Sequence, residues 1–312
     1  MPLMDPLSDV LSLLKLRTFN SGGFDAGGDW AVGFGRHDGI KFYAVASGAC
    51  WLAVDGVPEP MHIHAGDCIL LPRGQPFRAA SDPNLLLGDP TQLHPTARDG
   101  NITLCNGGGD FFSVGGYFTL MGAHCAILLE NLPPVVHIRT DPEKAVLHWC
   151  LDHMRQELLE PQPGGFLIAQ QLATMMLIQV LRLHLADGTP NGVGWLFALA
   201  DKKLLTAISA IHANPAHHWT VQALAQCTGM SRTSFAVRFT RAVGLAPMAY
   251  LTRWRMMLAA DRLTTSTDPI SVLAEELGYV SEAAFSNAFK RVMGSSPRRY
   301  GRASFPRSSE IR

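Results

Sequence analysis

The sequence predicts an α+β protein in which a β-rich N-terminal part precedes an all-α C-terminal domain. Short apolar runs broken by Gly, Pro and Asp fill residues 30–135 and are typical of strands and turns. From about residue 142 the apolar residues recur with helical spacing instead. Charge divides the chain in a similar way. Residues 1–199 hold 11 Lys and Arg against 19 Asp and Glu, whereas residues 200–312 hold 15 against 7, a net charge of +8.

The N-terminal region is expected to form a β-barrel or jelly roll. Its strands are predicted in the runs AVGFG, KFYAVASGACWLAVDG, CILLPRG and FFSVGGYFTL. VDG is a hairpin signal, and the Gly-Asp pair in AGDCILLPRG is expected to turn into a strand. Many short strands at this spacing are typical of closed or double-sheet all-β folds.

Two helices are predicted between about residues 142 and 187. EKAVLHWCLDHMRQELL is amphipathic, FLIAQQLATMMLIQVLRLHLA is strongly apolar, and PQPGG separates them. The second helix contains polar residues such as Gln170, Gln171 and Arg182, so we do not expect it to span a membrane. So apolar a helix needs a partner surface, either the barrel or a second copy of the chain. A linker to the next domain is expected near residues 195–205.

The C-terminal domain contains an internal duplication. Five residues recur at one fixed offset of 50: Phe235, Phe239, Gly244, Pro247 and Tyr250 return as Phe285, Phe289, Gly294, Pro297 and Tyr300. Identities at a constant offset are the signature of a repeat.

Each copy predicts a helix, a turn and a helix, over about residues 220–243 and 269–292. The expected N-caps are Thr220, Ser231 and Ser281, and the glycines expected to end the first helix of each copy are Gly229 and Gly278. Pro269 is expected in the first turn of its helix. Such a unit places its second helix in the DNA major groove, and the positive charge favours phosphate binding. The alternative is a helical repeat that only packs.

These two units resemble the DNA-binding domain of the AraC/XylS family of bacterial transcription regulators. WTVQALAQCTGMSRTSFAVRFTRAVGLAPMAYLTRWRMMLAADRL and ISVLAEELGYVSEAAFSNAFKRVMGSSPRRY carry the resemblance. It implies a cytoplasmic, sequence-specific regulator of transcription that binds double-stranded DNA and is more often an activator than a repressor. It also implies a domain over residues 200–305, with one long helix from about Pro247 to Leu263 joining the units.

The solvent faces of the two second helices are expected to read bases. These faces carry Thr233, Ala236, Val237 and Thr240 in the first unit and Ala283, Ser286 and Asn287 in the second. Phosphates are expected to bind at Ser231, Arg232, Arg238, Arg241, Ser281, Lys290, Arg291, Arg298 and Arg299. Family members often carry Arg where this chain has Val237 and Asn287, so a shifted base preference is expected.

The N-terminal region resembles the cupin-like sensor domain of one AraC subgroup, through WLAVDG, AGDCILLPRGQPF, LLENLPP and GWLFAL. This resemblance implies a domain for effector sensing and dimerisation over residues 1–195. It further implies a homodimer, a small-molecule effector and a contact with RNA polymerase. Phe77 and Gly115 stand where relatives often have His and Cys, so the pocket chemistry is expected to differ.

The sharpest candidate for a metal site is the pair His62 and His64 in MHIHAGD, because alternate residues on a strand point the same way. The turn residue Asp67 is a poor further ligand, and weaker candidates are His94, His124 and His137. The alternative is that the pair lines a surface or, with Phe77, an effector pocket. We therefore expect no metal and no cofactor.

The sequence shows no nucleophile–base–acid constellation, so we do not expect an enzyme. Two alternatives remain open: a cupin enzyme with a DNA-binding appendage, and an architectural DNA-binding protein without an effector. The six cysteines form no C-x-x-C pair and are expected to be reduced thiols, with redox sensing by two of them as the alternative.

Overall fold

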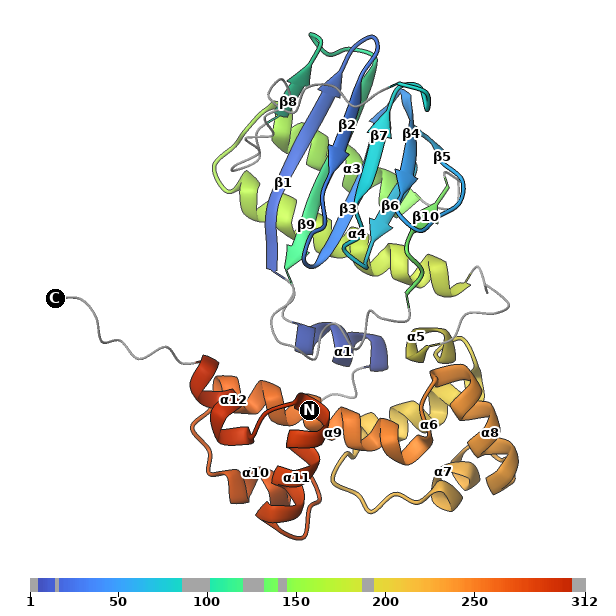
Figure 1. The fold of residues 1–312 in the computed structure, drawn as a ribbon, viewed down its shortest axis with the longest axis vertical. Coiled ribbons are helices and arrows are strands. Elements are labelled where there is room, and N and C mark those ends of the chain that lie inside the picture. The colour runs from blue at the N-terminus through green and yellow to red at the C-terminus, as the bar shows by residue number, and fades with distance from the viewer. Residues whose placement is uncertain are drawn as a thin grey trace, which may run out of the picture. The chain divides into compact units, whose positions relative to one another are not determined.

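The computed structural model describes residues 5–14, 17–85, 102–119, 132–139, 145–186 and 194–304. It divides into two compact units (Figure 1). One unit contains the strands together with helices α3 and α4. The other contains α1 and the helices from α5 to α12.

The described strands of the first unit form two sheets. One sheet has the order β10 (Val136–Ile138), β6 (Cys68–Leu71), β3 (Ile40–Ser47), β9 (Phe111–Thr119), β1 (Arg17–Ala26) and β8 (Ile102–Cys105). The other has the order β2 (Ala31–Phe34), β7 (Phe77–Ala80), β4 (Ala49–Val54) and β5 (Met61–His64). Neighbouring strands are antiparallel except β1 and β8, which are parallel. One core contains residues from both sheets, including Val45, Leu52 and Phe77.

The predicted strands are confirmed, and so is the hairpin at VDG, where Gly56 adopts a left-handed φ of +82° between β4 and β5. The predicted barrel is built as two separate sheets among the described residues. Strand β1 was not predicted, because RTFNSGGFDA is rich in Gly, Asn and Asp, which disfavour strands. Its pairing with β8 and β9 overrides that local preference.

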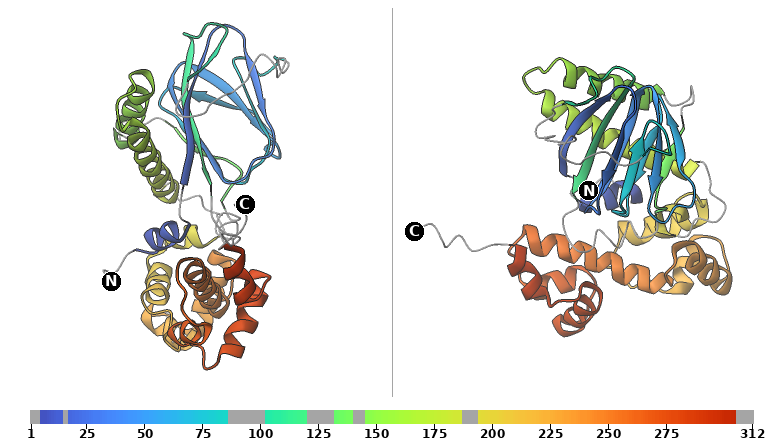
Figure 2. Two further views of the ribbon diagram at one scale, coloured as in Figure 1. Left: turned by 90° about the vertical axis from the view of Figure 1, so that its left-hand side faces the viewer. Right: turned by 45° about the horizontal axis from the view of Figure 1, so that its top comes forward.

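Helices α3 (Ala145–Leu159) and α4 (Gly165–Ala186) pack together and cover one face of the six-stranded sheet (Figure 2). Alternate residues of β3 and β9, such as Phe42 and Phe118, are buried on that face. Within the described part of the chain, α4 is the one helix long and apolar enough to cross a membrane. A side of α4 that includes Leu172, Met176 and Val180 is buried in the unit.

The second unit contains the two predicted helix-turn-helix repeats. The first is α7 (Val221–Cys227) with α8 (Arg232–Val243), and the second is α10 (Ile270–Glu276) with α11 (Glu282–Met293). The remaining helices are α1 (Pro6–Leu14), α5 (Trp195–Ala198), α6 (Lys202–Ala213), α9 (Pro247–Thr265) and α12 (Pro297–Ser304).

The predicted N-caps are confirmed. The side-chain oxygens of Thr220, Ser231 and Ser281 each accept a hydrogen bond from the backbone N–H three residues later, at 3.1, 3.2 and 3.2 Å. Pro269 differs from expectation because it is itself the N-cap residue, with an extended ψ of 143°, and the helix begins at Ile270.

Residues 195–205 are not a linker, because they form α5 and the start of α6. Helix α5 packs on α8, and the backbone N–H of Gly194 donates to the carbonyl of Ala242 at 2.7 Å. The apolar run WLFAL therefore belongs to the core of the helical unit.

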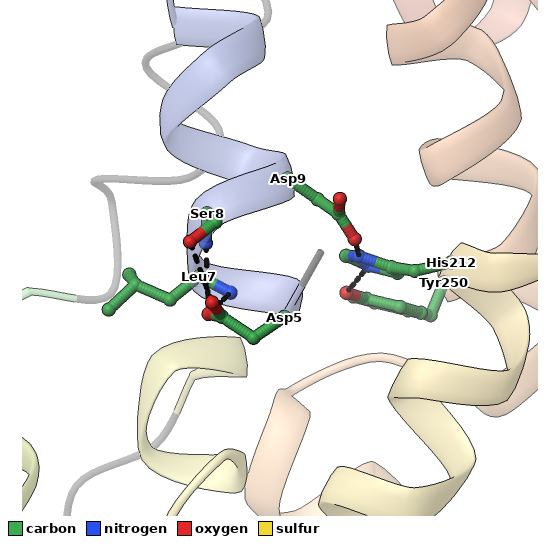
Figure 3. Close-up of polar contacts among 6 residues, drawn as sticks. All are labelled: Asp5, Leu7, Ser8, Asp9, His212 and Tyr250. Carbon is green, nitrogen blue, oxygen red and sulfur yellow. Dashed lines mark hydrogen bonds and ion pairs between the residues drawn. The ribbon is translucent and has the colours of Figure 1, made fainter. Parts of the chain in front are cut away.

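Helix α1 also belongs to the helical unit, although the sequence analysis assigned it to the first domain. Asp5 caps this helix, and Leu7 and Val10 are buried. Asp9 Oδ2 lies 3.0 Å from Nδ1 of His212 on α6, and His212 Nε2 lies 2.8 Å from the hydroxyl of Tyr250 on α9 (Figure 3). This buried polar contact was not predicted, since it joins residues about 200 positions apart.

Burial of the His212 imidazole favours its neutral form. Burial lowers its pKa, although Asp9 acts in the opposite direction. In the neutral ring, Nδ1–H donates to the Asp9 carboxylate and Nε2 accepts from the Tyr250 hydroxyl. The ring also stacks on Trp254, with centroids 3.7 Å apart.

Candidate nucleic-acid interface and cavity

The two recognition helices, α8 and α11, are anchored in the same way. Phe235 and Phe239 are fully buried under α8, and Phe285 and Phe289 under α11. Within each pair the ring centroids lie 5.5 and 5.9 Å apart, respectively. The two segments that the 50-residue offset relates therefore form a structural repeat.

Helix α9 extends from Pro247 to Thr265, two residues beyond the predicted end, and contributes to the cores of both repeats. Trp254 packs on His212, whereas Met256, Ala259 and Ala260 lie in the core of the second repeat. Because α9 is shared by two cores, it is buried on more than one side.

Contacts between the repeats also fix their relative position. Arg255 of α9 donates to the carbonyls of Pro215 and His217 at 2.6 and 3.0 Å, and its guanidinium lies 5.4 Å from the ring centroid of Tyr279. Gly278 adopts a left-handed φ of +76° and approaches the Ala216 carbonyl so closely that a Cβ would clash with it. The turn of the second repeat is thus packed against the connection between α6 and α7.

The residues predicted to read bases lie on the solvent side of α8 and α11. The exposed ones are Thr233, Val237, Thr240, Ala283 and Asn287, whereas Ala236 and Ser286 are half-buried. Val237 is 64% exposed, which is a large exposure for an apolar side chain. Their contact with bases remains a prediction.

The residues predicted to hold phosphates are exposed, but several have protein partners. The hydroxyls of Ser231 and Ser281 serve as helix caps. Arg238 Nε donates to Asp201 at 2.6 Å, and Arg298 lies 3.8 Å from Glu282. The other exposed candidates are Arg232, Arg241, Lys290, Arg291 and Arg299. Asp201 would therefore compete with a phosphate for Arg238, and the sequence did not indicate this contact.

A cavity of about 360 Å³ lies within the first unit, between the two sheets. Phe77 lines it together with Trp30, Phe34 and Phe111, and its role in binding an effector stays a prediction. The polar side chains at its wall include Lys41 and Tyr43, which the sequence analysis missed. Their position two residues apart on a strand was the available signal.

His62 and His64 do not line this cavity, which corrects the effector-pocket prediction for this pair. In β5 the side chain of Ile63 is buried and lines the cavity, so its two neighbours point outwards and are exposed. His62 stacks on Trp51 with centroids 4.5 Å apart, and the two imidazoles lie 4.2 Å apart.

The other candidate metal ligands are not gathered around these histidines. Asp67 Oδ2 accepts from the backbone N–H of His64 and pairs with His137 Nε2, each at 3.0 Å. His94 and His124 lie outside the described residues. No cluster of three or more His, Cys, Asp or Glu side chains suited to a metal is present in the part of the chain that the structure describes.

The presence of Gly at position 115 has a structural consequence. Gly115 pairs with Tyr43 across β9 and β3, and a Cβ at position 115 would lie 2.6 Å from the Tyr43 ring. The missing side chain therefore makes room for Tyr43 at the cavity wall.

The cysteines that the structure describes form no disulfide with one another. Burial raises the pKa of the Cys50 thiol to about 12 and also raises the pKa of Cys105 and Cys150. Thiols in this state are poorly reactive. Cys227 is exposed on α7 of the first helix-turn-helix. Cys125 lies outside the described residues.

Comparisons with known proteins match both units. The family described as Cupin matches residues 5–186, and the family described as Helix-turn-helix domain matches residues 224–303. An AraC-like transcription regulator of Streptomyces antibioticus is 43% identical over 305 residues, covering 97% of this chain and 100% of the relative. One from Streptomyces lividans is 44% identical, covering 95% and 98%. The regulator AlkR of Acinetobacter baylyi is 31% identical, covering 95% and 99%.

Proposed function

Because the chain belongs to the AraC-like transcription regulators, we propose that it is an effector-responsive activator that acts as a cytoplasmic homodimer. The chain is a sequence-specific DNA-binding transcription regulator with AraC-type helix-turn-helix units. Its families and relatives are transcription regulators and not enzymes, which sets aside the cupin-enzyme alternative.

DNA binding is supported above all by the two recognition helices, α8 and α11, which are held in a fixed position relative to each other. Helix α9, Arg255 and Gly278 fix the distance between α8 and α11, while both helices present exposed side chains. A rigid pair of this kind suits two successive major grooves on one side of the duplex, about 34 Å apart. Within this proposal the exposed faces of α8 and α11 read bases, and the surrounding Arg and Lys residues hold phosphates.

Homodimer formation is supported by an apolar surface on α3 and α4. Its exposed side chains are Val146, Trp149, Leu159, Phe166, Leu167 and Ile168, of which Leu167 is 62% exposed. Exposed apolar side chains on two neighbouring helices favour an interaction site, and a second copy would present the same helices. Sedimentation equilibrium of the Leu167→Glu variant should show monomers, whereas Val280→Glu, at another exposed apolar position, should remain dimeric.

The proposed response to an effector is supported by the cavity between the sheets. Apolar cavities with a few polar groups are typical of small-molecule sites. Activation would also require a contact with RNA polymerase.

Selection of fragments from the source genome by the full-length protein tests the proposal. We expect a sharp motif with two half-sites, and a reporter placed downstream should rise when the protein is expressed. Binding that ignores sequence would instead support the architectural alternative, and a repressed reporter would refute activation.

A further inference from the structure

The wall of the cavity is almost wholly apolar. Aromatic rings from several strands line it: Phe24, Trp30, Phe34, Phe77 and Phe111. Phe34 and Phe77 are stacked with centroids 4.4 Å apart, and Trp30 and Phe111 lie 5.0 Å apart. A ligand that fills such a space must be largely hydrocarbon, because a polar body would lose its hydration without replacement.

One cation interrupts this apolar wall. Lys41 lines the cavity on β3, and its Nζ lies 4.7 and 5.0 Å from the ring centroids of Phe34 and Phe77. Burial lowers the pKa of the ammonium group. Among the described residues no carboxylate pairs with it. A half-buried charge without a counterion is costly, so the site is complementary to an anion.

Tyr43 adds a hydrogen-bond donor to the same cavity wall. Tyr43 is two residues along β3 on the same side, and its ring centroid lies 5.6 Å from that of Phe77. Burial raises the pKa of the phenol, so the hydroxyl stays protonated. Gly115 provides the room for this ring, as described above.

We propose that the cavity binds a hydrophobic organic acid, whose carboxylate pairs with Lys41 and accepts a hydrogen bond from Tyr43, while its hydrocarbon body packs on the aromatic wall. This inference rests on the proposed effector response and names the class of effector. A hydrophobic amine would be repelled by Lys41, and a neutral hydrocarbon would leave the ammonium group without a partner.

Calorimetric titration of the full-length protein with matched acid and alcohol pairs tests the inference. The probes are decanoate against decanol, and cinnamate against cinnamyl alcohol. We expect each acid to bind more tightly than its alcohol by about tenfold to a hundredfold, the usual range for a charge-assisted contact. The Lys41→Met variant should lose this preference while its affinity for the alcohols changes little.

The exposed Lys203 provides the matched control. The Lys203→Met variant should keep the full preference for acids, and Tyr43→Phe should lose part of it. Equal affinity of the wild type for acid and alcohol, an acid preference that survives Lys41→Met, or no binding of any probe would overturn the inference.

The effect of the acids on DNA binding separates this inference from the proposed function. An acid that binds through Lys41 but leaves the affinity for the selected DNA motif unchanged would uphold the site and refute the effector response. If the protein shows no preference for a DNA sequence when no acid is present, the result would count against the proposed base-reading faces and not against the acid site.

Discussion

The two helix-turn-helix repeats have the same framework but different solvent faces. In both, a pair of buried Phe rings anchors the recognition helix and a Tyr ring closes the core. At the corresponding position of the two recognition helices, however, the first repeat has Val237 and the second has Asn287. Asn can form two hydrogen bonds with adenine, whereas Val can only contact an apolar group such as the thymine methyl.

The surroundings of the repeats differ as well. Tyr250 of the first repeat is buried and bonded to His212, which in turn bonds to Asp9 of α1. The corresponding Tyr300 is only half-buried. The duplication therefore conserved the helical frame, while each copy acquired its own partners. We infer that base discrimination is concentrated in the second repeat and that structural support is concentrated in the first.

The largest effect should come from breaking one recognition helix at a time. Proline at position 287 or 237 removes an interior hydrogen bond and costs about 3 kcal/mol or more of helix stability. Asn287→Pro should abolish specific binding in a mobility-shift assay, whereas Val237→Pro should leave a weak preference for the second half-site. The Ala variants at both positions keep the helix and serve as controls. An equal loss in both Pro variants would refute the unequal roles.

Removing only the side chains sharpens the comparison. Asn287→Ala should weaken binding to the selected site by about 1–3 kcal/mol and relax preference at one base pair. Val237→Ala removes two methyl groups and should cost about 1 kcal/mol or less. Titration of both variants against single-base-pair variants of the site measures the difference. An unchanged motif with Asn287→Ala would show that another residue reads the base.

The structural asymmetry predicts unequal effects on folding. Tyr250→Phe leaves a buried nitrogen of His212 without its donor and should lower the free energy of unfolding by about 1–3 kcal/mol. Tyr300→Phe, at a half-buried position, should cost less than Tyr250→Phe. Urea unfolding of the two variants provides the comparison, and equal losses would contradict it.

The His212 contact also predicts a dependence on pH. The pKa of His212 in the folded state lies below the ordinary value of 6.5. As the pH falls below about 6.5, the ring of the unfolded chain therefore takes up a proton before the ring of the folded protein does. The stability that this contact provides is therefore present above about pH 6.5 and is lost as the pH falls through the folded pKa. The neighbouring groups are Asp9, Tyr250 and Trp254.

Calorimetry between about pH 7.5 and 5.5 should show a falling melting temperature for the helical unit in the wild type. The fall should be smaller in His212→Gln and unchanged in His218→Gln, which alters an exposed imidazole. An identical fall in His212→Gln would assign the pH dependence to other groups.

The smallest effects should come from the charges around the repeats. Arg298→Ala should reduce the slope of log affinity against log salt by about 1, because one phosphate contact is lost. Arg238→Ala should reduce it less, since Asp201 already binds this side chain. Asp201→Asn keeps the cap of α6 but weakens its hold on Arg238, and should tighten binding to all sequences at low salt. Weaker binding by Asp201→Asn would contradict this competition.

Much of the helical unit was predictable because its signals are local. The caps at Thr220, Ser231 and Ser281 and the fixed 50-residue offset follow from neighbouring residues. The docking of α1 through Asp9 and the pairing of Arg238 with Asp201 could not be predicted, since each depends on residues brought together only by the fold.

The cavity was less predictable than the repeats. Phe77 was identified from its place in a family motif, but Lys41 and Tyr43 become neighbours of Phe77 only through the packing of the two sheets. The histidines of MHIHAGD were candidates because imidazoles bind metals and anions. The side chains of β5 alternate between the two faces of the sheet, however, and both histidines point outwards. The register of a strand determines which of two adjacent residues reaches the interior, and residue type alone does not reveal it.

Selection from random duplexes by the full-length wild type and by Asn287→Ala tests whether the second repeat reads adenine through Asn287. We expect two conserved blocks about one helical turn apart. One block should contain an adenine that Asn287→Ala no longer selects, while the other block stays the same. A wild-type motif with a single block, or an adenine preference retained by Asn287→Ala, would contradict this expectation.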